Sequence, residues 1–279
     1  MTFGNDQLEV TFRSDAYSGV RFDNTGFITQ VVRREGEKSV SYGTVESLIP
    51  GFGTGGLGLA NEFDGWQKIK DEEEGELVMK IGVGWLKIAP EGIGPFGKGL
   101  SILDGGQTVH EFGNDYAKVT WTLPLRSGYG CRLEKHFVVE GEQLIVNYSL
   151  ENTGENDFRS HEYAHNFINI GDTPVTEENY HLIALWDGEW KDITDYITFG
   201  EFPSYKGLFE KDVPTVTGIR GWRLTRRTDG ASMEEIVDFA PDKFAVWAQP
   251  HVLSCEVFTP FVIAPGETAR WTRRYTFKA

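Results

Sequence analysis

Runs in which apolar and polar residues alternate recur along most of the 279-residue chain. Three of the clearest follow one another, at residues 116–123, 131–139 and 143–150. Successive side chains of a strand point to opposite faces, so a period of two predicts half-buried β-strands. The last two runs are separated only by Glu-Gly-Glu, a length that favours an antiparallel hairpin.

Further segments have the same composition, and only one segment, 174–190, predicts a short helix. Residues 77–88 predict a strand pair or one kinked strand. The other predicted strands are 8–13, 27–34, 219–227, 234–239, 244–249, 252–259 and 268–277. Many strands with short connections predict an all-β fold, a large antiparallel β-sandwich forming a single domain over residues 1–279.

The segment 158–170, FRSHEYAHNFINI, is unusually polar for a predicted strand. A strand that only fills a core would not carry so many groups that are costly to bury unpaired. A period of two puts His161, Tyr163, His165, Phe167 and Asn169 on one face, and Glu162, Ala164, Asn166, Ile168 and Ile170 on the other. The first face indicates a groove that binds a ligand, or polar residues satisfied at a sheet edge. In the groove interpretation, Glu162 and Asn166 need buried partners unless the strand bulges.

Charged residues near the N-terminus and near two tryptophans are interpreted as surface features. Arg21 and Asp23 alternate with Phe22, so both charges project from the same side, as a local surface ion pair. The arginines of WRLTRR and WTRRYTF are interpreted as outward polar faces of strands.

The glycine-rich segment 50–65 predicts a long loop that ends in Asn61 and Glu62. This loop either lies close to a ligand or is simply a connection.

Composition and charge narrow the classes of partner. The formal net charge of −15 argues against nucleic acid and anionic membranes as partners, since both attract basic patches. An aromatic content of 13% suits β-structure and carbohydrate contact. Two cysteines are too few for a disulfide framework. The N-terminus lacks the features of a signal peptide, and no apolar run approaches the ~18 residues of a membrane span, so we expect a cytoplasmic protein.

Several segments together resemble the galactose mutarotase-like (aldose 1-epimerase) superfamily, as a divergent member. QLIVNYSLENTGEND and the following histidine strand resemble its central region, where the catalytic histidine lies in a His-x-aromatic-x-Asn-aliphatic pattern. His165 to Ile170, HNFINI, fits that pattern. Glu256, in LSCEVFTP, precedes a Pro-Gly-Glu-Thr turn and a final strand, as the family's glutamate does.

Two departures from the family pattern stand in the N-terminal half. GLGLANEF resembles a glycine-rich segment that closes in Asn-Arg, but Glu62 replaces the arginine. The His-Gly-Gly pattern of the family's second histidine is missing, since His110 lies too far along and lacks the glycines.

The resemblance implies cofactor-independent interconversion of sugar anomers, with Glu256 as base and His165 as acid. Opening a cyclic hemiacetal needs a base at the C1 hydroxyl and an acid at the ring oxygen, and burial can tune both side chains to these tasks. Periodicity supports the orientation of Glu256, because Leu253, Cys255 and Val257 form an apolar face opposite to it. For catalysis we expect His165 and Glu256 to face each other across an open cleft, with a gap of roughly 5–7 Å, about the size of a sugar ring.

The remaining predictions concern binding. The substrate-binding candidates are Asn61, Glu62, His161, Arg21, Lys135 and, as a stacking platform, Trp247. No metal is predicted, because no carboxylate–histidine spacing completes a known pattern. The expected partner is a small-molecule carbohydrate, with the chain as a monomer or homodimer. The alternatives are a non-catalytic carbohydrate-binding protein and a sugar lyase or hydrolase of the same fold.

Overall fold

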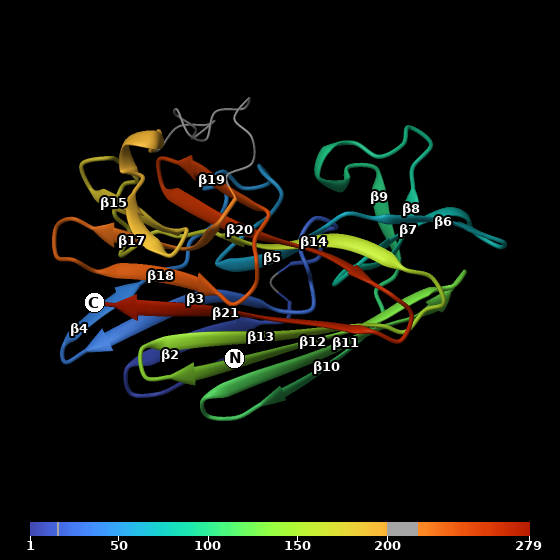
Figure 1. The fold of residues 1–279 in the computed structure, drawn as a ribbon, viewed down its shortest axis with the longest axis horizontal. Coiled ribbons are helices and arrows are strands. Elements are labelled where there is room, and N and C mark those ends of the chain that lie inside the picture. Colours follow the sequence, from blue (N-terminus) through green and yellow to red (C-terminus); the bar gives the residue numbers. More distant parts are fainter. Residues whose placement is uncertain (16, 200–216) are drawn as a thin grey trace.

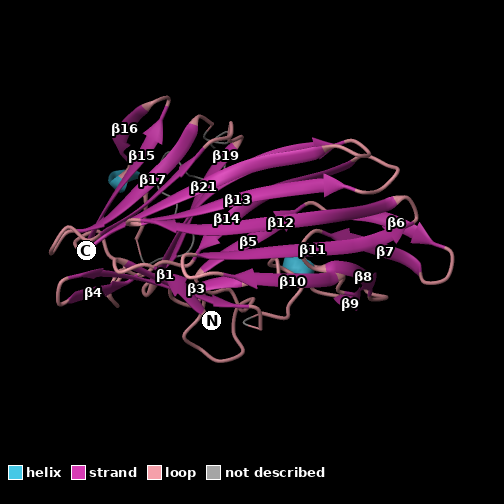
Figure 2. Cartoon of the chain, turned by 90° about the horizontal axis from the view of Figure 1, so that it is seen from below, coloured by secondary structure: helices cyan, strands magenta, loops and turns pink. Residues whose placement is uncertain are grey.

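The computed structural model describes residues 1–15, 17–199 and 217–279, and within them the strands form three antiparallel sheets (Figures 1 and 2). The first sheet carries the candidate site and has the order β1-β2-β3-β5-β14-β20-β19, with β4 paired to β3. Its strands are β1 (Thr2–Gly4), β2 (Leu8–Arg13), β3 (Phe27–Glu35), β4 (Lys38–Ser41), β5 (Leu59–Asp64), β14 (Phe158–Asn166), β19 (Lys243–Gln249) and β20 (Val252–Ile263).

The second sheet has the order β10-β11-β12-β13-β21-β18-β17-β15-β16. Its strands are β10 (Gln107–Phe112), β11 (Tyr116–Arg126), β12 (Tyr129–Glu140), β13 (Gln143–Asn152), β15 (Tyr180–Trp186), β16 (Glu189–Asp192), β17 (Ile219–Arg226), β18 (Ser232–Val237) and β21 (Thr268–Lys278).

A small sheet stands at one end of the molecule, on the right in Figure 1. It consists of β6 (Gln67–Asp71), β7 (Gly75–Lys80), β8 (Gly84–Ile88) and β9 (Leu100–Asp104). Among the residues that the structure describes, two short 3₁₀ helices, η1 (Pro95–Gly97) and η2 (Thr194–Tyr196), lie in connections. None of the helices in the described residues has the length and apolar character needed to span a membrane.

The inner faces of the two large sheets enclose the main hydrophobic core. Phe63 and Val257 of the first sheet belong to the same buried cluster as Trp222, Trp271 and Tyr275 of the second. The edge of Phe63 meets Trp271 at a ring-centroid distance of 6.3 Å. This packing explains the alternation in the sequence, because every second side chain along these strands enters the core. The predicted all-β antiparallel sandwich is confirmed.

Most predicted strands are confirmed, with small changes at their ends, and residues 77–88 contribute to a strand pair, β7 and β8. The helix predicted for 174–190 is wrong: this segment contains β15 and the start of β16. Leu182 and Ala184 alternate with more exposed residues and are fully buried beside β17, so sheet pairing decides the conformation. The loop predicted to end in Asn61 and Glu62 is also wrong at its end, because both residues lie in β5.

Candidate active site

His165 and Glu256 meet on the outer face of the first sheet, the face turned away from the second sheet. Tyr163 of β14 pairs with Phe258 of β20. Because the two strands are antiparallel, His165, two residues after Tyr163, reaches Glu256, two residues before Phe258. The Nε2 atom of His165 lies 3.3 Å from Oε1 of Glu256. This contact is shorter than the ring-sized gap that we expected, because the two residues are neighbours across adjacent strands rather than on opposite walls.

Aromatic rings surround the imidazole of His165. Phe167 stacks on it at a centroid distance of 4.1 Å, and Trp247 and Phe22 approach it edge-on at 5.3 and 5.8 Å. Phe22 and Phe167 are fully buried, whereas Trp247 keeps part of its surface exposed. The structure therefore brings the predicted platform, Trp247, to the candidate catalytic histidine.

Burial shifts the charge states of the two candidate catalytic groups. His165 is 4% exposed and Glu256 is 8% exposed. The pKa of His165 is well below its ordinary value because burial disfavours the imidazolium and Arg21 repels it. Burial also raises the pKa of Glu256 to about 7, although Arg21 and a hydrogen bond from Ser254 (3.2 Å) favour its charged form. Near neutral pH the site thus holds a neutral imidazole beside a carboxyl group that is close to half protonated.

The raised pKa of Glu256 predicts a specific pH dependence of stability. A carboxyl whose folded-state pKa lies above its ordinary 4.5 makes the folded protein bind more protons, so stability falls as the pH rises from 4.5 through 7. Glu256→Gln removes this titration. The unfolding free energy of the variant minus that of wild type is expected to rise by about 3 kcal/mol from pH 4 to pH 8. Urea denaturation of both proteins at pH 4, 6 and 8 measures the difference, and a difference independent of pH would contradict the assignment.

A second group of charges lies beside the pair on the same outer face. Glu62 accepts hydrogen bonds from Arg21 Nε at 2.9 Å, from Lys80 Nζ at 3.3 Å and from the hydroxyl of Tyr163. Arg21 also donates to Thr54 Oγ1 at 3.0 Å. The surface ion pair predicted for Arg21 and Asp23 is therefore wrong. Arg21 is buried and pairs with Glu62 of β5, 41 positions further along the chain.

Phe96 covers the guanidinium of Arg21 at a centroid distance of 4.4 Å. Phe96 is 61% exposed, and its backbone has a φ of 55°, a conformation that bulky residues rarely adopt. Phe96 thus holds a large exposed aromatic surface next to the candidate site. Sequence reasoning missed it because it lies in a glycine-rich connection with no periodicity to interpret.

The inner face of the same strands carries a buried polar network. Arg273 of β21 donates to Glu162 (Nη2–Oε2, 2.6 Å) and Glu235 (Nη1–Oε1, 2.7 Å). Asn166 donates to the carbonyl of Cys255 at 3.0 Å. These are the buried partners that the sequence required for Glu162 and Asn166. The outward face predicted for the arginines of WTRRYTF is wrong for Arg273, which is fully buried.

Three predicted binding residues lie away from the candidate catalytic pair. Asn61 is on the inner face, donating to Glu162 at 2.6 Å and accepting from Tyr148 at 2.8 Å. Lys135, 1% exposed, donates to Asp23 at 2.7 Å. His161 shares the outer face but bonds to Asp242 at 3.2 Å, at the far end of β14. Of the predicted set, Arg21, Glu62 and Trp247 gather near His165 and Glu256.

Comparison with known proteins gives one consistent result, at the level of structure. No family model matches the sequence, and no curated protein matches it. The structure is similar to a galactose mutarotase related enzyme from Lactobacillus acidophilus, with a TM-score of 0.60, 8% identity and coverage of 100% of this chain and 97% of that chain. This chain has the galactose mutarotase-like fold.

Two further structures with the galactose mutarotase-like fold support this assignment. One is a galactose mutarotase-like protein from Clostridium acetobutylicum, with a TM-score of 0.60, 12% identity and coverage of 99% of this chain and 94% of that chain. The other is an aldose epimerase homologue from C. elegans, with a TM-score of 0.56, 11% identity and coverage of 100% and 98%. The resemblance noted in the sequence is confirmed for the fold, whereas the roles of individual residues rest on the site itself.

Proposed function

We propose that the chain is an aldose 1-epimerase-like enzyme that interconverts the anomers of a sugar, with His165 and Glu256 exchanging the protons. The observation that carries the proposal is the 3.3 Å contact between a neutral imidazole and a carboxyl group with a pKa of about 7. General acid–base catalysis is most effective when the pKa of the catalytic group lies near the working pH. The galactose mutarotase-like fold supports a function on sugars.

The close contact suits the chemistry of ring opening. The C1 hydroxyl oxygen and the ring oxygen are bonded to the same carbon, so the groups that exchange protons with them must be neighbours. In the resting site the neutral His165 takes the proton of the C1 hydroxyl, and protonated Glu256 gives its proton to the ring oxygen as the C1–O bond breaks. The open-chain aldehyde then faces an imidazolium and a carboxylate that stabilise each other.

Ring closure runs the same transfers in reverse after the C1–C2 bond rotates. The imidazolium of His165 protonates the carbonyl oxygen, and the carboxylate of Glu256 removes the proton of the attacking hydroxyl. In ring opening these roles are the reverse of those that the sequence resemblance implies, because burial keeps His165 neutral and favours the protonated form of Glu256. No cofactor takes part in the proposed cycle.

Polar atoms beside the pair are available for a sugar. Nδ1 of His165 is buried and makes no hydrogen bond to any of the described residues. Buried polar atoms generally have partners, so a hydroxyl of a bound sugar is a natural one. Trp247 offers an apolar surface of the kind on which sugar rings pack, and Arg21 lies on the same side of the sheet.

The test is anomer exchange by NMR on a panel of aldoses. His165→Ala is expected to lower the exchange rate by about 100-fold or more, because the proton acceptor for ring opening is lost. His136→Ala is the matched control, since His136 is a partly buried histidine of β12 in the other large sheet. Wild type that binds sugars without accelerating exchange would overturn the enzyme proposal and leave a carbohydrate-binding protein.

A further inference from the structure

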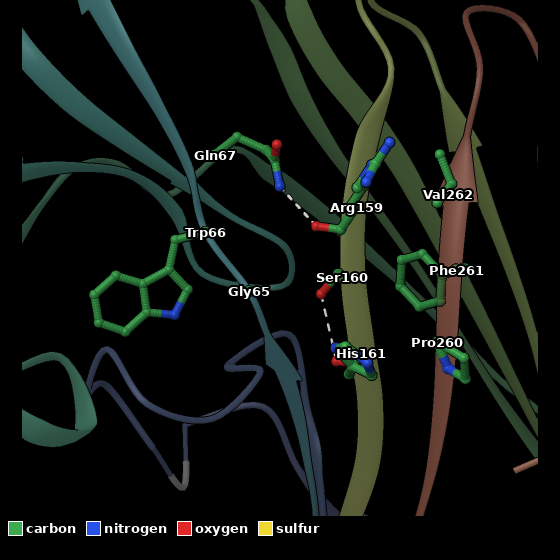
Figure 3. A pocket seen from close by; sticks show the side chains of 9 residues that line it. All are labelled: Gly65, Trp66, Gln67, Arg159, Ser160, His161, Pro260, Phe261 and Val262. Atoms are coloured by element: carbon green, nitrogen blue, oxygen red, sulfur yellow. Dashed lines mark hydrogen bonds between the residues drawn. The ribbon is translucent and has the colours of Figure 1, made fainter. Parts of the chain in front are cut away.

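A pocket of about 550 Å³ opens where β5 leaves β14 and the chain crosses to the small sheet (Figure 3). Gly65, Trp66 and Gln67 form one wall, and Pro260, Phe261 and Val262 of β20 form the opposite one. The start of β14, from Arg159 to His161, lies between them. Gln67 fixes the crossing by donating to the carbonyl of Arg159 at 2.6 Å.

This pocket shares two strands with the candidate catalytic pair. His161, at its edge, lies on the same face of β14 as His165, four residues away. A strand rises about 3.3 Å per residue, so the two positions are about 13 Å apart along the sheet. That spacing exceeds the width of one sugar ring, so a ligand that reaches both positions is an oligosaccharide.

The lining has the mixed character that sugar rings require. Trp66, Pro260 and Val262 offer apolar surfaces, and Val262 is 56% exposed to solvent. At the rim, the indole nitrogen of Trp66 and the guanidinium of Arg159 make no hydrogen bond to any other side chain or backbone group that the structure describes. Apolar walls with a few unpaired donors match the apolar faces and hydroxyl edges of a pyranose.

We propose that this pocket is a second sugar subsite, which binds a distal ring of an oligosaccharide whose reducing end lies at His165 and Glu256. The inference rests on the proposed function, and it names the substrate class: oligosaccharides rather than monosaccharides alone. Tyr163 and Phe258, stacked at 4.3 Å and both largely buried, lie between the two positions on the same face.

The test compares monosaccharides with trisaccharides on a variant that keeps the fold. Val262→Asp places a charge on the apolar wall, and the exposure of Val262 means that no core packing is lost. Calorimetric titration uses glucose, galactose and mannose beside maltotriose, galactotriose and mannotriose. The best-bound trisaccharide is expected to bind wild type more tightly than its monosaccharide, and Val262→Asp is expected to weaken only the trisaccharide, by about tenfold.

Val109→Asp is the matched control, since Val109 of β10 is a valine of similar exposure (59%) in the other large sheet. Equal weakening of both sugar sizes, or no change in either, would overturn the subsite. So would trisaccharides that bind no better than monosaccharides. Measuring anomer exchange of wild type on the same sugars separates the two proposals, because a trisaccharide preference in a wild-type protein that does not accelerate exchange supports the subsite while contradicting the enzyme.

Discussion

Glu256→Gln is expected to lower the rate of anomer exchange by about 100- to 10,000-fold, the range over which a positioned acid or base contributes to catalysis. Glutamine keeps the shape of the side chain and an oxygen that can accept the hydrogen bond from Ser254, but it cannot exchange a proton. NMR exchange rates on the substrate that wild type turns over best provide the measurement. The pH profile adds a second readout, because wild-type activity toward the cyclic sugar should fall above pH 7, where Glu256 loses its proton.

The control is Glu267→Gln, at an exposed carboxylate in the turn before β21. Its exchange rate should equal that of wild type. Urea denaturation of Glu256→Gln at pH 8 checks that the variant is folded, so that a loss of activity is not caused by unfolding. A Glu256→Gln protein with a rate within twofold of wild type would remove Glu256 from the mechanism.

Arg273→Met is expected to reduce the free energy of unfolding by about 3–5 kcal/mol, the usual cost of removing one partner from a buried ion pair. Arg273, Glu162 and Glu235 are all fully buried, and this arginine forms ion pairs with both carboxylates. Without it, at least one carboxyl must bind a proton to remain inside. The destabilisation should therefore grow as the pH rises from 5 to 8, which urea denaturation at the two pH values measures.

Arg274→Met, the next residue of β21, is the matched control, because its side chain is exposed and its loss should cost less than about 0.5 kcal/mol. A second variant, Glu162→Gln/Glu235→Gln/Arg273→Met, removes the uncompensated charges and should recover part of the stability at pH 8. A single Arg273→Met variant as stable as wild type at both pH values would contradict the structural role of the network.

Local patterns account for most of the strands and for the faces on which His165 and Glu256 lie. Alternation places each residue on the outer face of its own strand, and the resemblance identifies the two strands. Local patterns failed where a partner was distant. Arg21 is a surface residue by its neighbours in sequence, yet it is buried against Glu62. Lys135 looked like a candidate for the site, but Asp23, 112 positions away, holds it in the interior.

The sequence by itself determined the all-β architecture, the strand segments and the face on which each candidate catalytic residue lies, because these follow from a period of two and from the amount of apolar surface to be buried. Only the tertiary structure decided which charges are paired and which are available, since a pairing between strands depends on sheet order and register. For the same reason the 3.3 Å contact of His165 with Glu256, and the pocket beside β14, became visible only in the folded chain.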